Sequence, residues 1–374
     1  MLDLIFDPYN YPFWVIIAAI LVGIFGLISR PFLTYVMFAY PNAKFEAMGN
    51  PYITEKELNR IVDSKDLSSF KDVLNSSKDY ELSGDNAKEI QQSLDDNLIR
   101  TIEMMRKDSS KKMNGFFNTY IEKLDIYLIK HAIKNKLENK KIDEKEIEKA
   151  ILPETKKILQ GIKESEKQNM NEHLRKYGFE KEIIEAVSNE PPDYLIIDTT
   201  IDKYIIEKFK QIKVAYKCEK AKQKFVNTIT DVFNIKNILR AKQLGYDKES
   251  CMKLFLGEGQ IIAPWKFKAM TELESVPQVI SSLEGLSYYD SLKNVIEDYN
   301  KEKSVQILEN ALDSHLLKLV EDISTQNFVT IGPTIRFIVS KEIEIKNLKI
   351  IAKSISEGLS PELTKNFLIK EVGS

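Results

Sequence analysis

Residues 193–244 read DYLIIDTTIDKYIIEKFKQIKVAYKCEKAKQKFVNTITDVFNIKNILRAKQL and contain neither glycine nor proline. A second segment without these residues runs from 116 to 152. Glycine and proline are the strongest breakers of local structure, so their absence over such lengths favours helices over strands. Only 14 glycines and 12 prolines occur in 374 residues, and we therefore predict an all-α protein.

Apolar residues within the chain recur at helical spacing. Two such sets are Ile205, Phe209, Ile212 and Tyr216, and Ile338, Ile345, Leu348, Ala352 and Ile355. Spacings of three, four and seven residues place side chains on one face of a helix. Such faces are typical of helices that pack on a core, so we interpret both sets as core faces and not as ligand sites.

The sequence repeats itself weakly about every 110 residues. Phe116–Thr119 (FFNT) matches Phe225–Thr228 (FVNT) at an offset of 109, and in this register Asp125 aligns with Asn234. At a further offset of 110, Glu344–Leu348 (EIKNL) aligns with Asn234–Ile238 (NIKNI). These matches predict three related helical units in series.

Each unit contains a helix break followed by a restart. Asp143, Asp247 and Ser360 are positioned to accept hydrogen bonds from the first free amides of the next helix. Asp143 also has the capping-box spacing to Glu146, and Pro361 suits a first helical position.

Two further helices are predicted early in the first unit. One would be capped by Thr54 and run through Leu58 and Ile61, and the other would begin at Ser68 and run through Val73 and Leu74. The third unit has a similar pair at 270–273 and 276–283. With breaks at Leu152-Pro153 and at 257–264, the predicted domains are 1–35, 36–152, 153–257 and 258–374.

The N-terminal region is strongly apolar. Residues 13–28 read FWVIIAAILVGIFGLI, and no charge lies between Asp7 and Arg30. A helix over residues 12–29 would be about 27 Å long, close to the hydrocarbon thickness of about 30 Å. The predicted membrane-inserting side chains are Phe13, Trp14, Ile17, Ile20, Leu21, Ile24, Phe25 and Ile28.

A cleaved signal peptide and a buried core helix are the alternatives for this segment. A signal peptide begins with positive charge, whereas Asp3 and Asp7 precede this apolar run. Because the first charges after the run are Arg30 and Lys44, the positive-inside rule places the N-terminus outside and the remaining residues in the cytoplasm.

Composition and motifs argue against several functions. Lys and Arg number 54 and Asp and Glu 56, and this balance is unlike the basic surface of a nucleic-acid binder. Cys218 and Cys251 form no Cys-x-x-Cys unit, no Gly-Lys dipeptide exists for a phosphate loop, and the three histidines are far apart. We therefore expect no catalytic residues, cofactor, metal or small-molecule substrate.

Four motifs, in this order, resemble one known family. They are Tyr40–Lys44 (YPNAK), Asn234–Lys242 (NIKNILRAK), Leu256–Gly259 (LGEG) and Lys341–Leu348 (KEIEIKNL). Over about residues 36–374, the chain resembles the C subunit of A-type and V-type rotary ATPases, whose eukaryotic relative is the d subunit of V-ATPase.

The resemblance implies three related helical bundles in a pseudo-threefold arrangement on the cytoplasmic face of the cell membrane. Such a protein joins the shaft, made of subunits D and F, to the proteolipid rotor ring of a proton-translocating ATP synthase. It would transmit torque without being an enzyme itself. The candidate partner contacts are Asn237, Arg240, Lys242, Glu344 and Asn347, whose alternative role is hydrogen bonding between helices.

The apolar N-terminal helix departs from the usual pattern of the family, whose members mostly begin near the YPNAK motif. A helix on the rotation axis would not resist rotation, so we hypothesise that residues 12–29 enter the opening of the proteolipid ring. Two other classes remain open: a membrane-tethered helical scaffold with stacked repeats, and a membrane-anchored enzyme with a deep ionisable pocket.

Overall fold

The computed structural model describes residues 11–48, 55–77, 79–166, 169–179 and 181–370. Every regular element in these ranges is a helix, so the predicted all-α class is confirmed. The long helices are α2 (Tyr11–Met48), α5 (Ala87–Asp108), α6 (Asn114–Leu137), α11 (Tyr194–Gln211), α12 (Glu219–Gln243), α18 (Val305–Gln326) and α19 (Gly332–Ser356). The short helices are α3 (Glu55–Val62), α4 (Leu67–Asn75), η1 (Lys111–Met113), α7 (Glu144–Glu148), α8 (Pro153–Glu164), α9 (Met170–Lys176), α10 (Lys181–Ser188), α13 (Lys248–Met252), α14 (Pro264–Thr271), α15 (Val276–Ser282), α16 (Tyr289–Lys293), α17 (Ile296–Glu302) and α20 (Pro361–Asn366).

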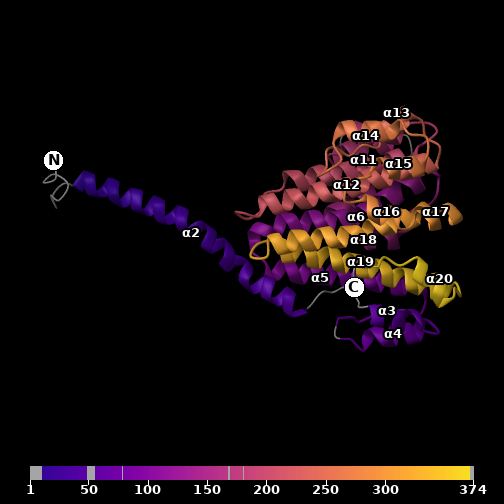
Figure 1. The fold of residues 1–374 in the computed structure, drawn as a ribbon, viewed down its shortest axis with the longest axis horizontal. Coiled ribbons are helices and arrows are strands. Elements are labelled where there is room, and N and C mark those ends of the chain that lie inside the picture. The colour runs from indigo at the N-terminus through magenta and orange to yellow at the C-terminus, as the bar shows by residue number, and fades with distance from the viewer. Residues whose placement is uncertain (1–10, 49–54, 78, 167–168, 180, 371–374) are drawn as a thin grey trace.

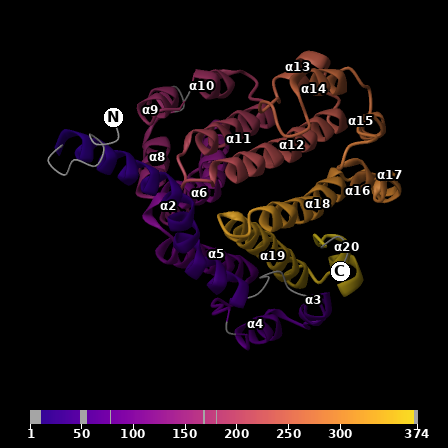
Figure 2. The same cartoon turned by 60° about the vertical axis from the view of Figure 1, so that its left-hand side comes forward.

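Six long helices form a closed circle of contacts. Short connections join them into three pairs, α5 with α6, α11 with α12, and α18 with α19 (Figures 1 and 2). Between pairs, α6 packs on α11, α12 packs on α18, and α19 packs on α5. The scaffold alternative predicted an open stack of repeats, and this closed order of contacts differs from that expectation.

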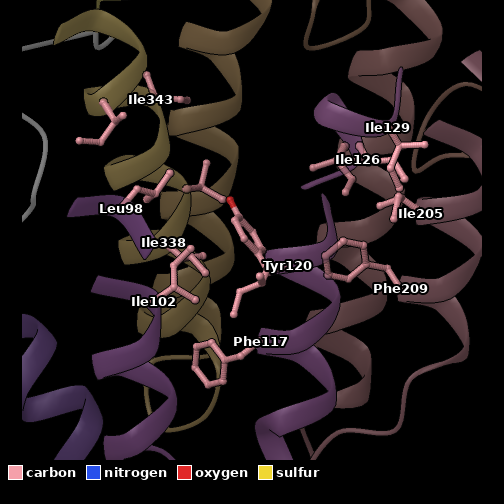
Figure 3. Packing of buried hydrophobic residues seen from close by; sticks show 14 of the residues in the cluster. Leu98, Ile102, Phe117, Tyr120, Ile126, Ile129, Ile205, Phe209, Ile338 and Ile343 are labelled. Carbon is pink, nitrogen blue, oxygen red and sulfur yellow. The ribbon is translucent and has the colours of Figure 1, made fainter. Parts of the chain in front are cut away.

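Aromatic side chains fill the core where the first two pairs meet. The ring centroids of Phe116 and Phe225, which the sequence repeat aligns, lie 6.3 Å apart. Phe209 of α11 lies 6.0 Å from Phe116 and 6.4 Å from Phe225. Figure 3 shows Phe209 facing Tyr120 of α6, with a centroid distance of 6.2 Å. Residues that the repeat relates therefore pack against one another.

The segment 193–244 is not continuously helical, contrary to the uninterrupted face expected from Ile205 to Tyr216. Helix α11 ends at Gln211, and Tyr216 lies in the following turn with 48% of its surface exposed. The cause is Lys222, a buried lysine of α12. Its ammonium group donates to the carbonyl oxygens of Lys210 and Ile212, at 3.1 and 2.7 Å. A lysine can therefore satisfy the last carbonyls of a helix where no glycine or proline marks the end.

The second predicted face is confirmed over most of its length. Ile338, Ile345, Leu348 and Ala352 of α19 are buried, and Ile355 is half-buried at the edge of the core.

The three predicted restarts are confirmed by their caps. The side-chain oxygens of Asp143, Asp247 and Ser360 accept from backbone amides at the start of α7, α13 and α20. The carboxylate of Glu146, predicted to complete a capping box, lies 3.6 Å from Nδ1 of His131. These caps start short helices at related places in the three units.

The early helical pair is also present, with one correction. Helix α4 begins one residue before Ser68, because Asp66 and Ser69 form a reciprocal capping box that fixes the start at Leu67. Helix α3 runs through Leu58 and Ile61 as predicted, whereas Thr54 lies outside the described residues.

Helix α2 extends beyond the predicted residues 12–29 and continues through Pro31 and Pro41 to Met48. Its C-terminal part docks on the body. Nδ2 of Asn42 donates to the carbonyl oxygens of Phe328 and Thr330, at 2.8 and 3.0 Å. The apolar part leaves the body and is not buried by it, so the alternative of a core helix is wrong (Figure 1).

Candidate interaction site

Ion pairs join the six helices of the circle to one another. Between α19 and α5, Nζ of Lys349 lies 2.7 Å from an Asp95 carboxylate oxygen. Between α6 and α19, Nζ of Lys123 lies 2.5 and 2.7 Å from the two oxygens of Glu342. These charged side chains connect elements that are far apart in the sequence, so they help to fix the order of the helices.

Similar ion pairs lie between α6 and α11 and between α12 and α18. Lys130 of α6 lies 2.6 Å from Asp202 of α11. Arg240 of α12 binds both carboxylate oxygens of Glu309 on α18, and its Nη2 donates at 2.7 Å. This two-point geometry holds a guanidinium and a carboxylate in one relative orientation, which a single bond from lysine does not do.

The most buried of these contacts lies between α12, α18 and α19. Asp313 accepts from Lys236 and, at 2.8 Å, from Lys346. Burial raises the pKa of Asp313, but the two ammonium groups outweigh burial and hold the pKa below its usual value. Burial lowers the pKa of Lys236, and Asp313 opposes this effect. Removing Asp313 would leave Lys236 buried without the carboxylate that it binds, and removing Lys236 would leave Asp313 with Lys346 alone.

A recess of about 750 Å³ lies between α5, α6 and α19. Five lysines contribute to its lining, namely Lys88, Lys149, Lys346, Lys349 and Lys353. Three carboxylates, those of Asp95, Asp125 and Glu342, also line it. Lysines outnumber carboxylates in this lining, so the recess suits an acidic segment of a partner better than a basic one.

Buried aspartates of α6 and α12 each bind the backbone of a segment further along the chain. The Asp125 carboxylate of α6 accepts from the amides of Ile151 and Leu152, the latter at 2.8 Å. The Asp231 carboxylate of α12 accepts from Gln260, Ile261 and Ile262, at 2.8 to 3.0 Å. Both segments lead into a helix that begins with proline, α8 or α14.

The aspartate that binds the later segment does not occupy aligned positions in the first two repeats. The sequence match paired Asp125 with Asn234, whereas the bonding pattern pairs Asp125 with Asp231, one helical turn earlier. Burial raises the pKa of both aspartates, that of Asp231 to about 6. The sequence analysis did not identify Asp231, because its partners are backbone amides about 30 residues away and no sequence motif indicates such contacts.

The five candidate partner contacts all make contacts within this chain. Asn237, Glu344 and Asn347 are buried, with exposed fractions of 4%, 3% and 2%. Glu344 accepts from Lys341 at 2.8 Å and from the Tyr80 hydroxyl. Lys242 donates to the carbonyl oxygen of Thr271 at 2.9 Å, and Arg240 binds Glu309. Contact with another protein stays a prediction, and the half-exposed Arg240 and Lys242 are the members that a partner can reach.

The predicted membrane-inserting residues lie along the free part of α2. Leu21, Phe25 and Ile28 expose 59%, 72% and 71% of their surface. Phe13 and Ile17 are half-exposed, and the remaining members, Trp14, Ile20 and Ile24, are exposed. Among the described residues, α2 is the one helix that is long and apolar enough to cross a membrane. In the same part of the chain, no group of three or more His, Cys, Asp or Glu is arranged to hold a metal ion.

A closed circle of charged helices carrying one free apolar helix defines an all-helical protein with one candidate membrane span among its described residues. The family model of the ATP synthase (C/AC39) subunit matches residues 41–367. The chain belongs to this family, which confirms the resemblance predicted from the four motifs.

Relatives of similar length carry the same description. The chain is 30% identical over 362 residues to the C subunit of the A-type ATP synthase of Methanocaldococcus jannaschii, covering 91% of this chain and 88% of the relative. It is 28% identical over 348 residues to the C subunit of the A-type ATP synthase of Methanosphaera stadtmanae, covering 91% and 90%.

Proposed function

We propose that this chain is the central-stalk component of an A-type proton-translocating rotary ATP synthase. It would join the shaft of subunits D and F to the proteolipid ring and pass torque between them. The observation that carries the proposal is the closed circle of helices with ion pairs between neighbouring pairs. A closed circle resists twisting better than an open stack, because no helix can move without displacing both neighbours.

Three related bundles, 36–152, 153–257 and 258–374, would surround a pseudo-threefold axis. The three helix pairs support this arrangement, as do the equivalent caps at Asp143, Asp247 and Ser360. The first two units also share the aspartate contact to the segment that enters the next helix. An adaptor of this shape needs no catalytic group of its own.

The lysine-rich recess between α5, α6 and α19 is the proposed seat for an acidic part of the shaft. Lys88 and Lys353, which are both exposed, would contact it directly. Of the five residues named from the sequence, Arg240 and Lys242 are proposed to contact a partner. The buried Asn237, Glu344 and Asn347 would position the helices that carry the contact surface.

Helix α2 would cross the cell membrane with its N-terminus outside and the helical body on the cytoplasmic face. Its apolar residues and Arg30, the first charge after them, support this orientation. We further propose that the span occupies the central opening of the proteolipid ring. Crosslinks from Ile20 or Phe25 to the inner helices of the ring would support that position, and crosslinks to stator proteins alone would exclude it.

Purification of the tagged chain in mild detergent tests the main proposal. We expect subunits D and F and the proteolipid to co-purify, and reversing Lys88 and Lys353 together to glutamate to release D and F while keeping the proteolipid. Lys248 and Lys253, reversed together, provide a control of equal charge change at α13. Recovery of other proteins without rotary components would favour the membrane-tethered scaffold.

A further inference from the structure

Three turns between paired helices lie together at the end of the body from which α2 departs. They are residues 109–113, 212–218 and 327–331, and we call them the turn face. Helix α2 contacts the second and third turns and the end of α5 beside the first turn. Its Arg30 guanidinium lies 5.3 Å from the centroid of the Tyr216 ring, its Asn42 binds Phe328, and its Lys44 lies 2.6 Å from Asp108.

The turn face is basic. It carries the exposed lysines Lys111, Lys112, Lys213 and Lys217, and no Asp or Glu occurs within the three turns. The adjoining carboxylates are already paired, because Asp108 binds Lys44 at 2.6 Å and Glu219 lies 2.7 Å from Lys222. The positive charge of the four lysines is therefore not cancelled by these neighbours.

Exposed apolar side chains lie among these lysines. Tyr216, Phe328 and Val329 expose 48%, 54% and 53% of their surface. Lysines mixed with aromatic and apolar side chains are typical of segments that lie at the membrane–water interface. The contact between Tyr216 and Arg30 also fixes the depth of the turn face relative to the membrane. Arg30 is the first charge after the apolar part of α2, so it marks the end of the span.

We propose that the turn face binds the anionic headgroups of lipids around the point where α2 enters the bilayer. This inference rests on the proposed membrane crossing of α2. If α2 lies in the opening of the proteolipid ring, the lipid concerned is the lipid that fills this opening around α2, and the position of Arg30 brings the turns to the level of its headgroups. The four lysines supply the charge that anionic headgroups attract, and the exposed apolar side chains reach the boundary of the acyl chains.

The test uses the full-length chain reconstituted in phosphatidylcholine vesicles with or without phosphatidylglycerol. A fluorophore on Val329→Cys reports contact with a quencher attached to lipid headgroups. The two native cysteines, Cys218 and Cys251, are buried. We expect strong quenching with phosphatidylglycerol, several-fold less without it, and a decrease at high salt.

Reversal of charge provides the matched comparison. Lys111→Glu, Lys112→Glu, Lys213→Glu and Lys217→Glu together should abolish the quenching that depends on phosphatidylglycerol. The same change at four exposed lysines elsewhere, Lys253, Lys268, Lys293 and Lys301, should leave it intact.

Resistance of the chain to carbonate extraction is measured on every sample and reports whether α2 is inserted. An inserted chain without quenching would overturn the lipid contact of the turn face but not the membrane crossing of α2. It would assign the four lysines to a protein partner. A chain that carbonate removes would overturn both the membrane crossing and the lipid contact.

Discussion

Asn234 on α12 and Asn347 on α19 make the same contact in two different repeats, although the sequence match aligned Asn234 with Glu344, three residues before Asn347. The side-chain oxygen of each accepts a backbone N–H from the residue 22 positions further along the chain, Leu256 or Ile369, at 2.9 Å. Each carboxamide also donates to a carbonyl of that segment, Gly257 or Ile369, at 2.9 or 2.7 Å. The equivalent contacts show that the repeat includes the chain segment after the long helix and not only the helix.

Replacing Asn347 should weaken the fold. Asn347→Ala leaves the N–H and carbonyl of Ile369 without this buried partner, and we expect the free energy of unfolding to fall by about 2 kcal/mol. Asn347→Asp keeps an acceptor for the N–H, and in its protonated form it can also donate to the carbonyl, so it should cost less than Asn347→Ala at low pH. Urea unfolding followed by circular dichroism measures both. Equal stability of Asn347→Ala and the wild type would contradict the assigned contact.

Asp231 should make stability depend on pH. Burial raises its pKa in the folded state to about 6, from an ordinary value of 3.8. Between these values the folded chain holds the proton more tightly than the unfolded chain. The contribution of Asp231 to the free energy of unfolding is therefore fully present below about pH 3.8. It is lost as pH rises to about 6, with a total change of about 3 kcal/mol.

The matched variant is Asp231→Asn, which cannot titrate. We expect the wild type to lose stability relative to the variant as pH rises from about 4 to about 7, in a series of urea titrations. Comparison with the variant is necessary because burial also raises the pKa of Asp125 and Glu344. A difference between the two proteins that does not change with pH would refute the assignment.

The buried ion pair between Lys236 and Asp313 should show strong coupling. Lys236→Met leaves the carboxylate with Lys346 alone, and we expect a loss of about 3 kcal/mol, the cost typical of breaking a buried pair. Lys236→Met combined with Asp313→Leu removes both buried charges and should recover part of that loss. A double-mutant cycle by thermal or urea unfolding measures the coupling. Additive effects would argue against a direct pair.

Residue pattern alone was sufficient to predict the fold class, the apolar helix and the three capped restarts. Each of these depends on local chemistry: few breakers, an uncharged run, or a capping side chain next to the helix that it caps. The repeat was visible because Phe116 and Phe225 keep the same aromatic position. Their contact in the core explains why that position carries a large aromatic ring in both units.

The errors and omissions have a different cause. Lys222 ends α11 by binding the carbonyls of Lys210 and Ile212, which no local signal reveals. The role of Asp231 depends on amides 29 to 31 residues away. Pairs such as Lys349 with Asp95 join residues 254 positions apart. Charged residues on a helix surface look alike in sequence, and only the packed circle of helices selects which of them meet.

The last prediction concerns the membrane crossing of α2. Leu21 lies near the middle of residues 12–29, where an arginine costs about 3 kcal/mol in membrane insertion. Leu21→Arg should therefore lower the ratio of inserted to non-inserted chain on the order of a hundredfold, and carbonate should extract more of this variant from membranes. Leu363→Arg on α20 adds the same charge at a leucine that is 52% exposed on the body, and should leave extraction unchanged. Equal retention of both variants would mean that protein contacts and not the bilayer hold this chain at the membrane, since only a helix surrounded by lipid is sensitive to a charge at its centre.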